Sequence, residues 1–525
     1  RHPAGAELSL GRAPSSSGPL LRIENKGTLM HHRASNRALA APLLVVLLAS
    51  LPQAQTIGSF PVVAVPPGNP LTPEKVLLGK ALFFEEQLSS DNTMACATCH
   101  LPDAGGTDAR AGGRAPGTDE VLDTADDEFG SFAVVRQDRE AEYRRHNRFE
   151  FARQVTNRHT PTIYGAAFFD ALFWDMRAGS EFRDLSGNVV LPAFAALESQ
   201  AVAPLLSPVE MAHEASSWPS ILAKLGSVRP LALARDLPDP LARFVGAAND
   251  YGELFERAFG TGEITRERIA MAIASYERVL VPDQTPFDLG TMTAEQAWGF
   301  RVFQGRGTCT ACHPANGLFS DGFRHSIGLP DHPRSTKTPT LRNVGLQKRL
   351  TSSGQFADLE EVVAHYERMG FFLPPALKPD ERRALIAFLG NALTDERVLR
   401  RAPPFDRPTL HGEVEPFGSN VYGQAWPGTG GSLPELIANA PANLGNGDFK
   451  IGLGNALGGA PAFLVLGAAR TRLGTTFRGV PLHVDLRGAD IRTQTLSGTG
   501  ARRGVTTFRL PLPADSALLG LRRFV

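Results

Sequence analysis

Apolar residues recur with the period of an α-helix in several segments before residue 403. In the segment 263–281, five apolar residues can share one helix face: Ile264, Ile269, Ala272, Ile273 and Tyr276. The segments 358–369 and 380–393 also have helical patterns. We therefore expect this part of the chain to be mainly α-helical, with loops between the helices.

Two more helices have clear start signals, and each leads into the same cysteine motif. Thr72 is a helix cap followed by a proline at the first helical position, and its helix precedes Cys-x-x-Cys-His at 96–100. Thr293 and Gln296 form a capping box, and their helix precedes a second Cys-x-x-Cys-His at 309–313. A unit of one helix followed by one motif therefore occurs twice.

The pattern changes past residue 403. Glycine, proline and asparagine become more frequent, and short alternating runs at 482–486 and 505–512 predict β-strands. Similar turn-rich stretches lie at 428–433, 446–449 and 455–459. We expect residues 403–525 to form an all-β, sandwich-like module, to which the sequence assigns no role.

The length of the chain indicates how many domains to expect, and its charge excludes one class of partner. The chain has 525 residues, with 54 basic and 54 acidic side chains. This length predicts more than one domain. No basic stripe is present, so we do not expect nucleic acid as a partner.

The region 30–55 has the layout of a secretory signal. Met30 precedes a basic stretch, an apolar run follows at 38–51, and 52–54 supplies a cleavage region. We expect export to the periplasm, with extracellular or cell-envelope association as the other option, and we interpret residues 1–29 as an extension from a misplaced start. An N-terminal membrane anchor is the alternative. No later segment is long and apolar enough to span a membrane.

The two motifs use every cysteine of the chain and predict two covalently bound haem c groups. Each pair of thiols can form thioethers to one porphyrin, and the adjacent histidine can ligate its iron. The residues concerned are Cys96, Cys99, His100, Cys309, Cys312 and His313. Zinc would require all four thiols together, and thioredoxin-like chemistry would require a βαβ context. We expect His100 and His313 to be the proximal iron ligands.

Segments around the motifs extend this hypothesis. They are 78–84, 160–162, 173–178, 208–211, 338–344 and 359–366, in that order along the chain. Over residues 71–393 the chain resembles the bacterial di-haem cytochrome c peroxidase family, which includes the di-haem enzyme that matures methylamine dehydrogenase. The resemblance implies two cytochrome c-like haem domains in tandem: a peroxidatic domain at 56–285 and an electron-transfer domain at 286–402.

The resemblance also implies three catalytic residues. Gln200 and Glu210 match the amide and the carboxylate beside the open iron, where a carboxylate can move a proton between peroxide oxygens. An amide can hydrogen-bond the bound peroxide. Trp174 matches the tryptophan between the two haems. Without the resemblance, Glu210 would be read as a surface or capping acid, and Trp174 as a core residue.

Two distal ligand positions depart from the family pattern. Thr351 stands where the second haem usually has a methionine, or a tyrosine in the maturase, and Met369 nearby is interpreted as a packing residue. Loss of a thioether ligand should lower the potential of this haem. Phe151 stands where classical peroxidases of that family carry a removable distal histidine on the first haem. Either the displaced His146 replaces that histidine or, as we favour, the first haem is permanently open.

A third departure concerns calcium. The resemblance implies an interdomain calcium ion with an asparagine ligand, but His159 occupies that position, and histidine suits a hard cation poorly. Asn157 is a substitute. The stretch 102–138, rich in glycine and aspartate, predicts a long surface insertion. Its acids, Asp119, Asp123, Asp126 and Asp127, are either a calcium site or a solvated loop.

The leading hypothesis is an oxidoreductase of the cytochrome-c peroxidase type that reduces hydrogen peroxide to water. Its electrons would come from a small cytochrome c or a cupredoxin. The alternatives are a maturase-like oxidase acting on a protein or organic substrate, and a non-enzymatic di-haem electron carrier. A homodimer is one assembly that we consider.

Overall fold

The structure is a computed structural model that describes residues 6–9, 60–110, 113–116, 119, 121–124, 127–329, 335–414, 419–421, 425–438, 440–471, 476–477, 480–518 and 522–524. The expected signal peptide at 30–55 lies outside the described residues. Among the helices that are described, none has the length and apolar character needed to cross a membrane.

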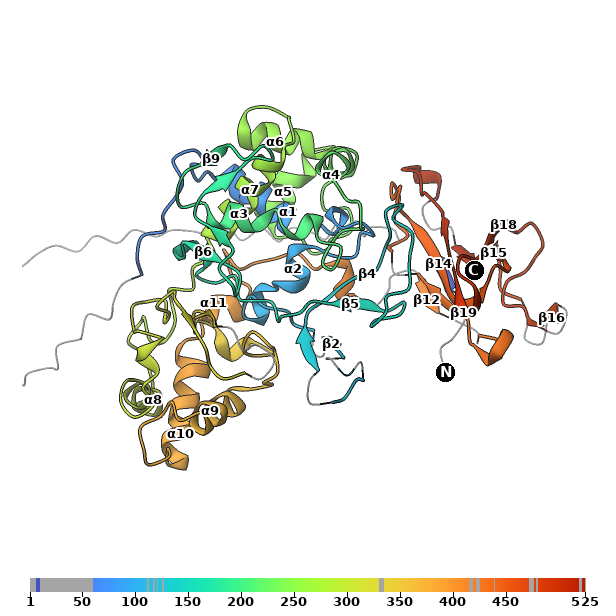
Figure 1. Ribbon diagram of the computed structural model, residues 1–525. Helices are drawn as coiled ribbons and strands as arrows, with labels where there is room; N and C mark the ends of the chain where they lie inside the picture. The colour runs from blue at the N-terminus through green and yellow to red at the C-terminus, as the bar shows by residue number, and fades with distance from the viewer. Residues whose placement is uncertain are drawn as a thin grey trace, which may run out of the picture.

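A first group of helices surrounds the largest apolar core (Figure 1). Its members are α1 (Pro73–Phe83), α2 (Cys96–Cys99), α3 (Ala196–Ala201), α4 (Trp218–Leu225), α5 (Asp239–Gly246), α6 (Tyr251–Phe259) and α7 (Arg266–Arg278). Thr72 caps α1 as the sequence predicts, with its side chain accepting from the Lys75 amide. Helices α1 and α7 cross closely at Gly79, where a Cβ atom would lie only 1.8 Å from the Ala272 carbonyl oxygen.

A second group of helices also has a close helix crossing at a glycine. It contains α8 (Ala294–Gln304), α9 (Leu359–Arg368), α10 (Pro379–Ala387) and α11 (Glu396–Leu399), and α10 continues into a π-helical turn, Phe388–Ala392. The capping box of Thr293 and Gln296 is confirmed. At Gly299 of α8, a Cβ atom would lie 1.9 Å from the Ala384 carbonyl oxygen of α10. Each helix before a cysteine motif therefore crosses a later helix at a glycine.

Short strands connect the helices. They are β2 (Gly113–Ala115), β3 (Glu128–Gly130), β4 (Phe132–Val135), β5 (Arg153–Val155), β6 (Ala171–Leu172), β7 (Ala178–Gly179), β8 (Phe182–Arg183), β9 (Val189–Leu191), β10 (Arg324–His325) and β11 (Thr336–Lys337). The expectation of a surface insertion at 102–138 is wrong for much of its length. Asp108, Ala115 and Val134 are buried, because this stretch supplies β4 and packs beside the first motif.

The C-terminal region is a β-module, as expected. Its strands are β12 (Ser419–Val421), β13 (Glu435–Ile437), β14 (Lys450–Gly458), β15 (Pro461–Leu466), β16 (Thr476–Phe477), β17 (Val480–Pro481), β18 (Asp490–Thr495), β19 (Gly500–Arg509) and β20 (Arg522–Phe524). Strands β13, β14 and β19 form one antiparallel sheet, β15 pairs with β18, and β1 (Ala6–Ser9) pairs with β12 and β20. An apolar core that includes Ile451, Leu464 and Phe508 lies within the module.

The two predicted strands of this module have different outcomes. Strand β19 confirms the prediction at 505–512, although it ends at Arg509. The strand predicted at 482–486 is wrong. This segment bonds irregularly to the loop at 469–471, where Asp485 donates to the Ala469 carbonyl and Val484 forms only an isolated bridge to Arg470.

Candidate active site

The first motif opens onto a cavity of about 610 Å³ in the first group of helices. Helix α2 is a single turn, and the His100 amide continues it by donating to the Cys96 carbonyl at 2.9 Å. This turn places Cys96, Cys99 and His100 in one wall of the cavity. Nδ1 of His100 lies 3.4 Å from the Gly106 carbonyl oxygen. Burial lowers the pKa of His100 to about 4, so its imidazole is neutral, as a metal ligand must be.

The second motif has the same local arrangement in a cavity of about 210 Å³. The His313 amide donates to the Cys309 carbonyl at 2.8 Å, and Nδ1 of His313 lies 2.7 Å from the Phe319 carbonyl oxygen. A carbonyl that accepts from Nδ1 leaves Nε2 free for a metal. Burial lowers the pKa of His313 to about 4. Both cavities thus offer two thiols and a neutral histidine, a donor set that fits a c-type haem.

Gln200 and Glu210 line the first cavity together with the first motif, as the sequence hypothesis requires. Gln200 lies in α3, and Glu210 follows the short helix Pro204–Leu206. Burial raises the pKa of the Glu210 carboxyl, against the opposing effects of a hydrogen bond from Ser207 and the charge of Arg177. A carboxyl with a raised pKa exchanges protons more readily near neutral pH.

A further carboxyl group in this cavity, which the sequence did not predict, is buried. Glu277 of α7 is 6 % exposed and lines the first cavity, and its Oε2 atom is buried without a hydrogen-bond partner. Burial raises its pKa to about 8. The adjacent Arg278 forms a fully buried ion pair with Glu198 instead, at 2.8 Å. The sequence did contain one indication of this site: the charged pair Glu277 and Arg278 directly follows Tyr276, the last residue of the apolar helix face.

Trp174 stands in the wall that the two cavities share. Its side chain is buried, and Nε1 donates to the His159 carbonyl oxygen at 2.7 Å. Its own carbonyl accepts from the Lys337 amide at 2.8 Å. Lys337 also lines both cavities, and its Nζ lies 3.8 Å from the centre of the Phe169 ring. Burial lowers the pKa of this lysine to about 8.

Known proteins resemble this chain in sequence. A sequence model of the di-haem cytochrome c peroxidase family matches residues 73–296. The methylamine utilization protein MauG of Methylophilus methylotrophus is 30% identical over 61% of this chain and 80% of its own length. The chain belongs to the di-haem cytochrome c peroxidase family.

Two further proteins are similar to this chain at lower identity. Cytochrome c551 peroxidase of Pseudomonas aeruginosa is 25% identical over 61% of this chain and 79% of its own length. A solved structure of a MauG-like protein associated with microbial copper homeostasis is 23% identical, covering 68% of this chain and 97% of that protein, with a TM-score of 0.45. Family membership confirms the resemblance, and it implies haem c cofactors and oxidoreductase chemistry.

The structure also places the residues that the sequence analysis considered as distal ligands of the two haems. His146 is not among the residues that line the first cavity; it borders a neighbouring depression with Arg136 and Gln154, and its ring stacks on Phe149. Phe151 is buried in an apolar cluster with residues of the β-module. Thr351 lines the second cavity in a left-handed backbone conformation with φ 71°, whereas Met369 lines neither cavity.

The calcium candidates that the structure describes are not brought together as a cation site. His159 is buried in the wall shared by the two cavities, and its Nε2 atom has no hydrogen-bond partner. Asn157 lines the first cavity only. Asp127 is buried beside Arg114, which also pairs with Asp123. Asp126 lies outside the described residues. Among the acids that are described in this loop, no group of three lies close enough to hold an ion.

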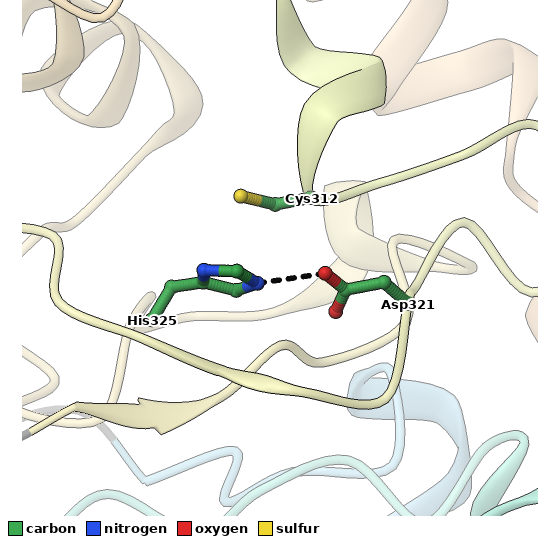
Figure 2. Close-up of side chains that lie close together, drawn as sticks. All are labelled: Cys312, Asp321 and His325. Carbon is green, nitrogen blue, oxygen red and sulfur yellow. Dashed lines mark hydrogen bonds and ion pairs between the residues drawn. The ribbon is translucent and has the colours of Figure 1, made fainter.

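Figure 2 shows Cys312, Asp321 and His325 side by side at the second motif. Nε2 of His325 lies 2.7 Å from Oδ2 of Asp321, and the three ligand atoms lie within 4.8 Å of one another. Cys312 is one of the predicted haem-attachment thiols, and a thioether at this position would remove it from the trio. A histidine–aspartate pair then remains beside the second cavity.

Proposed function

We propose that the protein is an exported, periplasmic di-haem peroxidase that reduces hydrogen peroxide to water. One observation carries this proposal. Glu210 and Gln200, which come from a different part of the chain than the first motif, line the same cavity as His100. The pKa of the Glu210 carboxyl is raised by burial, as a proton-transfer group requires.

The reaction consumes two electrons and two protons for each peroxide and releases two water molecules. When bound, the haem at the first motif supplies an iron that binds peroxide and accepts its oxidising equivalents. Glu210 takes the proton from one peroxide oxygen and returns it to the other, so that the departing oxygen leaves as water. The Gln200 amide donates a hydrogen bond that stabilises the charge developing on the peroxide.

Electrons reach this cavity from the second motif. The Trp174 indole spans the shared wall, and its hydrogen bond to the His159 carbonyl fixes the ring there. We propose that Trp174 carries electrons between the two sites. A small cytochrome c or a cupredoxin would supply them at the second cavity.

Steady-state turnover of peroxide by the full-length, haem-loaded protein with reduced cytochrome c tests this function. We expect turnover together with a high-spin signal from the first haem in the electron paramagnetic resonance spectrum. A fully loaded protein without turnover contradicts the peroxidase. Two low-spin haems that are inert to peroxide would instead support an electron carrier.

A maturase-like oxidase is the second candidate, and Thr351 favours it. A threonine in the second cavity removes the thioether that favours ferrous iron. A lower potential at the second haem suits storage of oxidising equivalents for another substrate. Peroxide-dependent oxidation of a protein or organic substrate, without oxidation of cytochrome c, would support this candidate.

A further inference from the structure

The C-terminal β-module packs against the first haem-binding region at the loop that follows β4. In Figure 1, β14 and β19 lie next to the end of the β4–β5 hairpin. One apolar cluster joins Tyr143 and Phe151 of this loop to Ile437 and Val505 of the module. The Tyr143 amide also donates to Oγ1 of Thr507 at 2.9 Å.

A buried lysine lies at the centre of this interface. Lys450, the first residue of β14, is 2 % exposed. Its ammonium group donates to Oε1 of Gln137 at 2.5 Å and to the Ala141 carbonyl at 2.6 Å, and lies 5.1 Å from the centre of the Tyr143 ring. The other charged groups that act on it are Asp91, Asp448, Lys224 and Arg509.

Gln137 connects this lysine to the segment that carries Glu210. Its carbonyl oxygen accepts from the Glu214 amide at 3.1 Å, and its Nε2 donates to Oγ of Ser90 at 2.9 Å. The Ser90 amide in turn donates to the Met211 carbonyl at 2.8 Å. These bonds therefore anchor the segment 210–214 at Met211 and at Glu214. The Glu210 carbonyl itself accepts from the Val134 amide of β4 at 3.2 Å.

We propose that Lys450 is a positioning residue that holds Glu210 in the first cavity through Gln137. Loss of the ammonium group would leave two buried acceptors, on Gln137 and Ala141, without their donor. The loop would move to satisfy them, and the attached 210–214 segment would move with it. The β-module would therefore act as a support for the peroxide-reacting site. This proposal rests on the proposed role of Glu210 in proton transfer.

The test compares Lys450→Met with Arg487→Met, a variant at an exposed arginine of the same module, in the full-length haem-loaded protein. We expect Lys450→Met to slow peroxide turnover by about 10- to 100-fold, as for a small misplacement of a catalytic group. Its pH profile should also lose the limb assigned to Glu210. Arg487→Met should match the wild type. A wild-type rate and pH profile in Lys450→Met would overturn the proposal.

Cyanide supplies a readout that does not depend on peroxide turnover. Hydrogen cyanide must lose a proton to bind as the anion, so a misplaced Glu210 should slow its association with the first haem to a similar extent. If the wild type had no peroxide turnover, the proposed function would fail, while this measurement would still test the positioning. Unchanged cyanide association in Lys450→Met would contradict it.

A double variant separates positioning from general destabilisation. If Lys450 acts through Gln137, Lys450→Met combined with Gln137→Leu should be no slower than the slower single variant. Effects that multiply would contradict the proposed route. Should Lys450→Met fail to load haem, Lys450→Gln replaces it in all three comparisons, because it removes the charge and shortens the side chain while its amide group can still donate hydrogen bonds.

Discussion

Glu210, Glu277 and Asp175 bring three carboxyl groups to the wall of the first cavity, and Gln200 brings an amide, whereas no carboxyl group lines the second among the residues described. The attachment motifs at the two cavities are otherwise alike, with a histidine whose Nδ1 atom faces a carbonyl in each. The second cavity is also smaller, at about 210 Å³ against about 610 Å³.

On the proposed function, the motif decides where a haem is attached and the residues of the cavity wall decide what chemistry that haem can support. Peroxide reduction needs protons, and of the two cavities, as lined by the described residues, the first alone has carboxyl groups to move them. An electron store needs none, and apolar walls keep water away from it. Trp174 and Lys337 stand in the wall shared by the two cavities, and we propose that this wall couples the two functions.

The largest effect is expected from a substitution that removes proton transfer in the first cavity. Glu210→Gln keeps the shape of the side chain and abolishes proton transfer, so peroxide turnover should fall by about 10²- to 10⁴-fold. Haem content and the spectrum of the second haem should not change. Glu360→Gln, at a largely exposed acid of α9, is the matched control. Retention of turnover in Glu210→Gln would remove the distinction between the cavities.

A smaller effect is expected from a substitution that slows electron transfer between the two cavities. Trp174→Phe removes the indole and its hydrogen bond to the His159 carbonyl. We expect turnover to fall by about tenfold or more, equivalent to ~1.4 kcal/mol in the barrier. Stopped-flow oxidation of the second haem after a peroxide pulse should slow to the same extent. Equal rates in wild type and variant would mean that electrons bypass Trp174.

Thr351→Met should make the second cavity resemble that of the usual peroxidases. A thioether ligand should raise the reduction potential of the second haem, measured by optical titration, with a smaller change in turnover. Thr351 itself already holds the left-handed conformation at this position, so the methionine adds no new backbone strain. Thr351→Val is the control without a sulfur ligand. An unchanged potential in Thr351→Met would show that this position does not reach the iron.

The smallest effect concerns stability. Burial raises the pKa of Glu277 from 4.5 to about 8 in the folded protein. The folded protein holds the proton on Glu277 more tightly than the unfolded chain does. The stability linked to this proton is therefore fully present below pH 4.5. Above that pH the free energy of unfolding falls as pH rises towards 8, by up to about 1.4 kcal/mol per pH unit.

Glu277→Gln cannot ionise, so its unfolding free energy should fall less over this pH range. Denaturant unfolding of the haem-loaded protein at several pH values measures the difference. Parallel curves for wild type and Glu277→Gln would show that Glu277 ionises normally.

Local sequence determined a large part of this protein. The start signals at Thr72 and Thr293 correctly located two helices, because a capping side chain bonds amides only three residues away. The Cys-x-x-Cys-His spacing determined each attachment turn for the same reason. Gln200, Glu210 and Trp174 were found only through the family resemblance, since no local pattern distinguishes them from surface or core residues.

Tertiary structure decided the rest. Glu277 becomes a cavity residue because α7 crosses α1 at Gly79, a contact between positions far apart in the sequence. The irregular pairing at 482–486 and the burial of 102–138 likewise depend on distant partners that a periodic pattern does not name. Lys450 reaches Gln137 across 313 positions of the chain, and only the packed fold brings that ammonium group to the segment that carries Glu210.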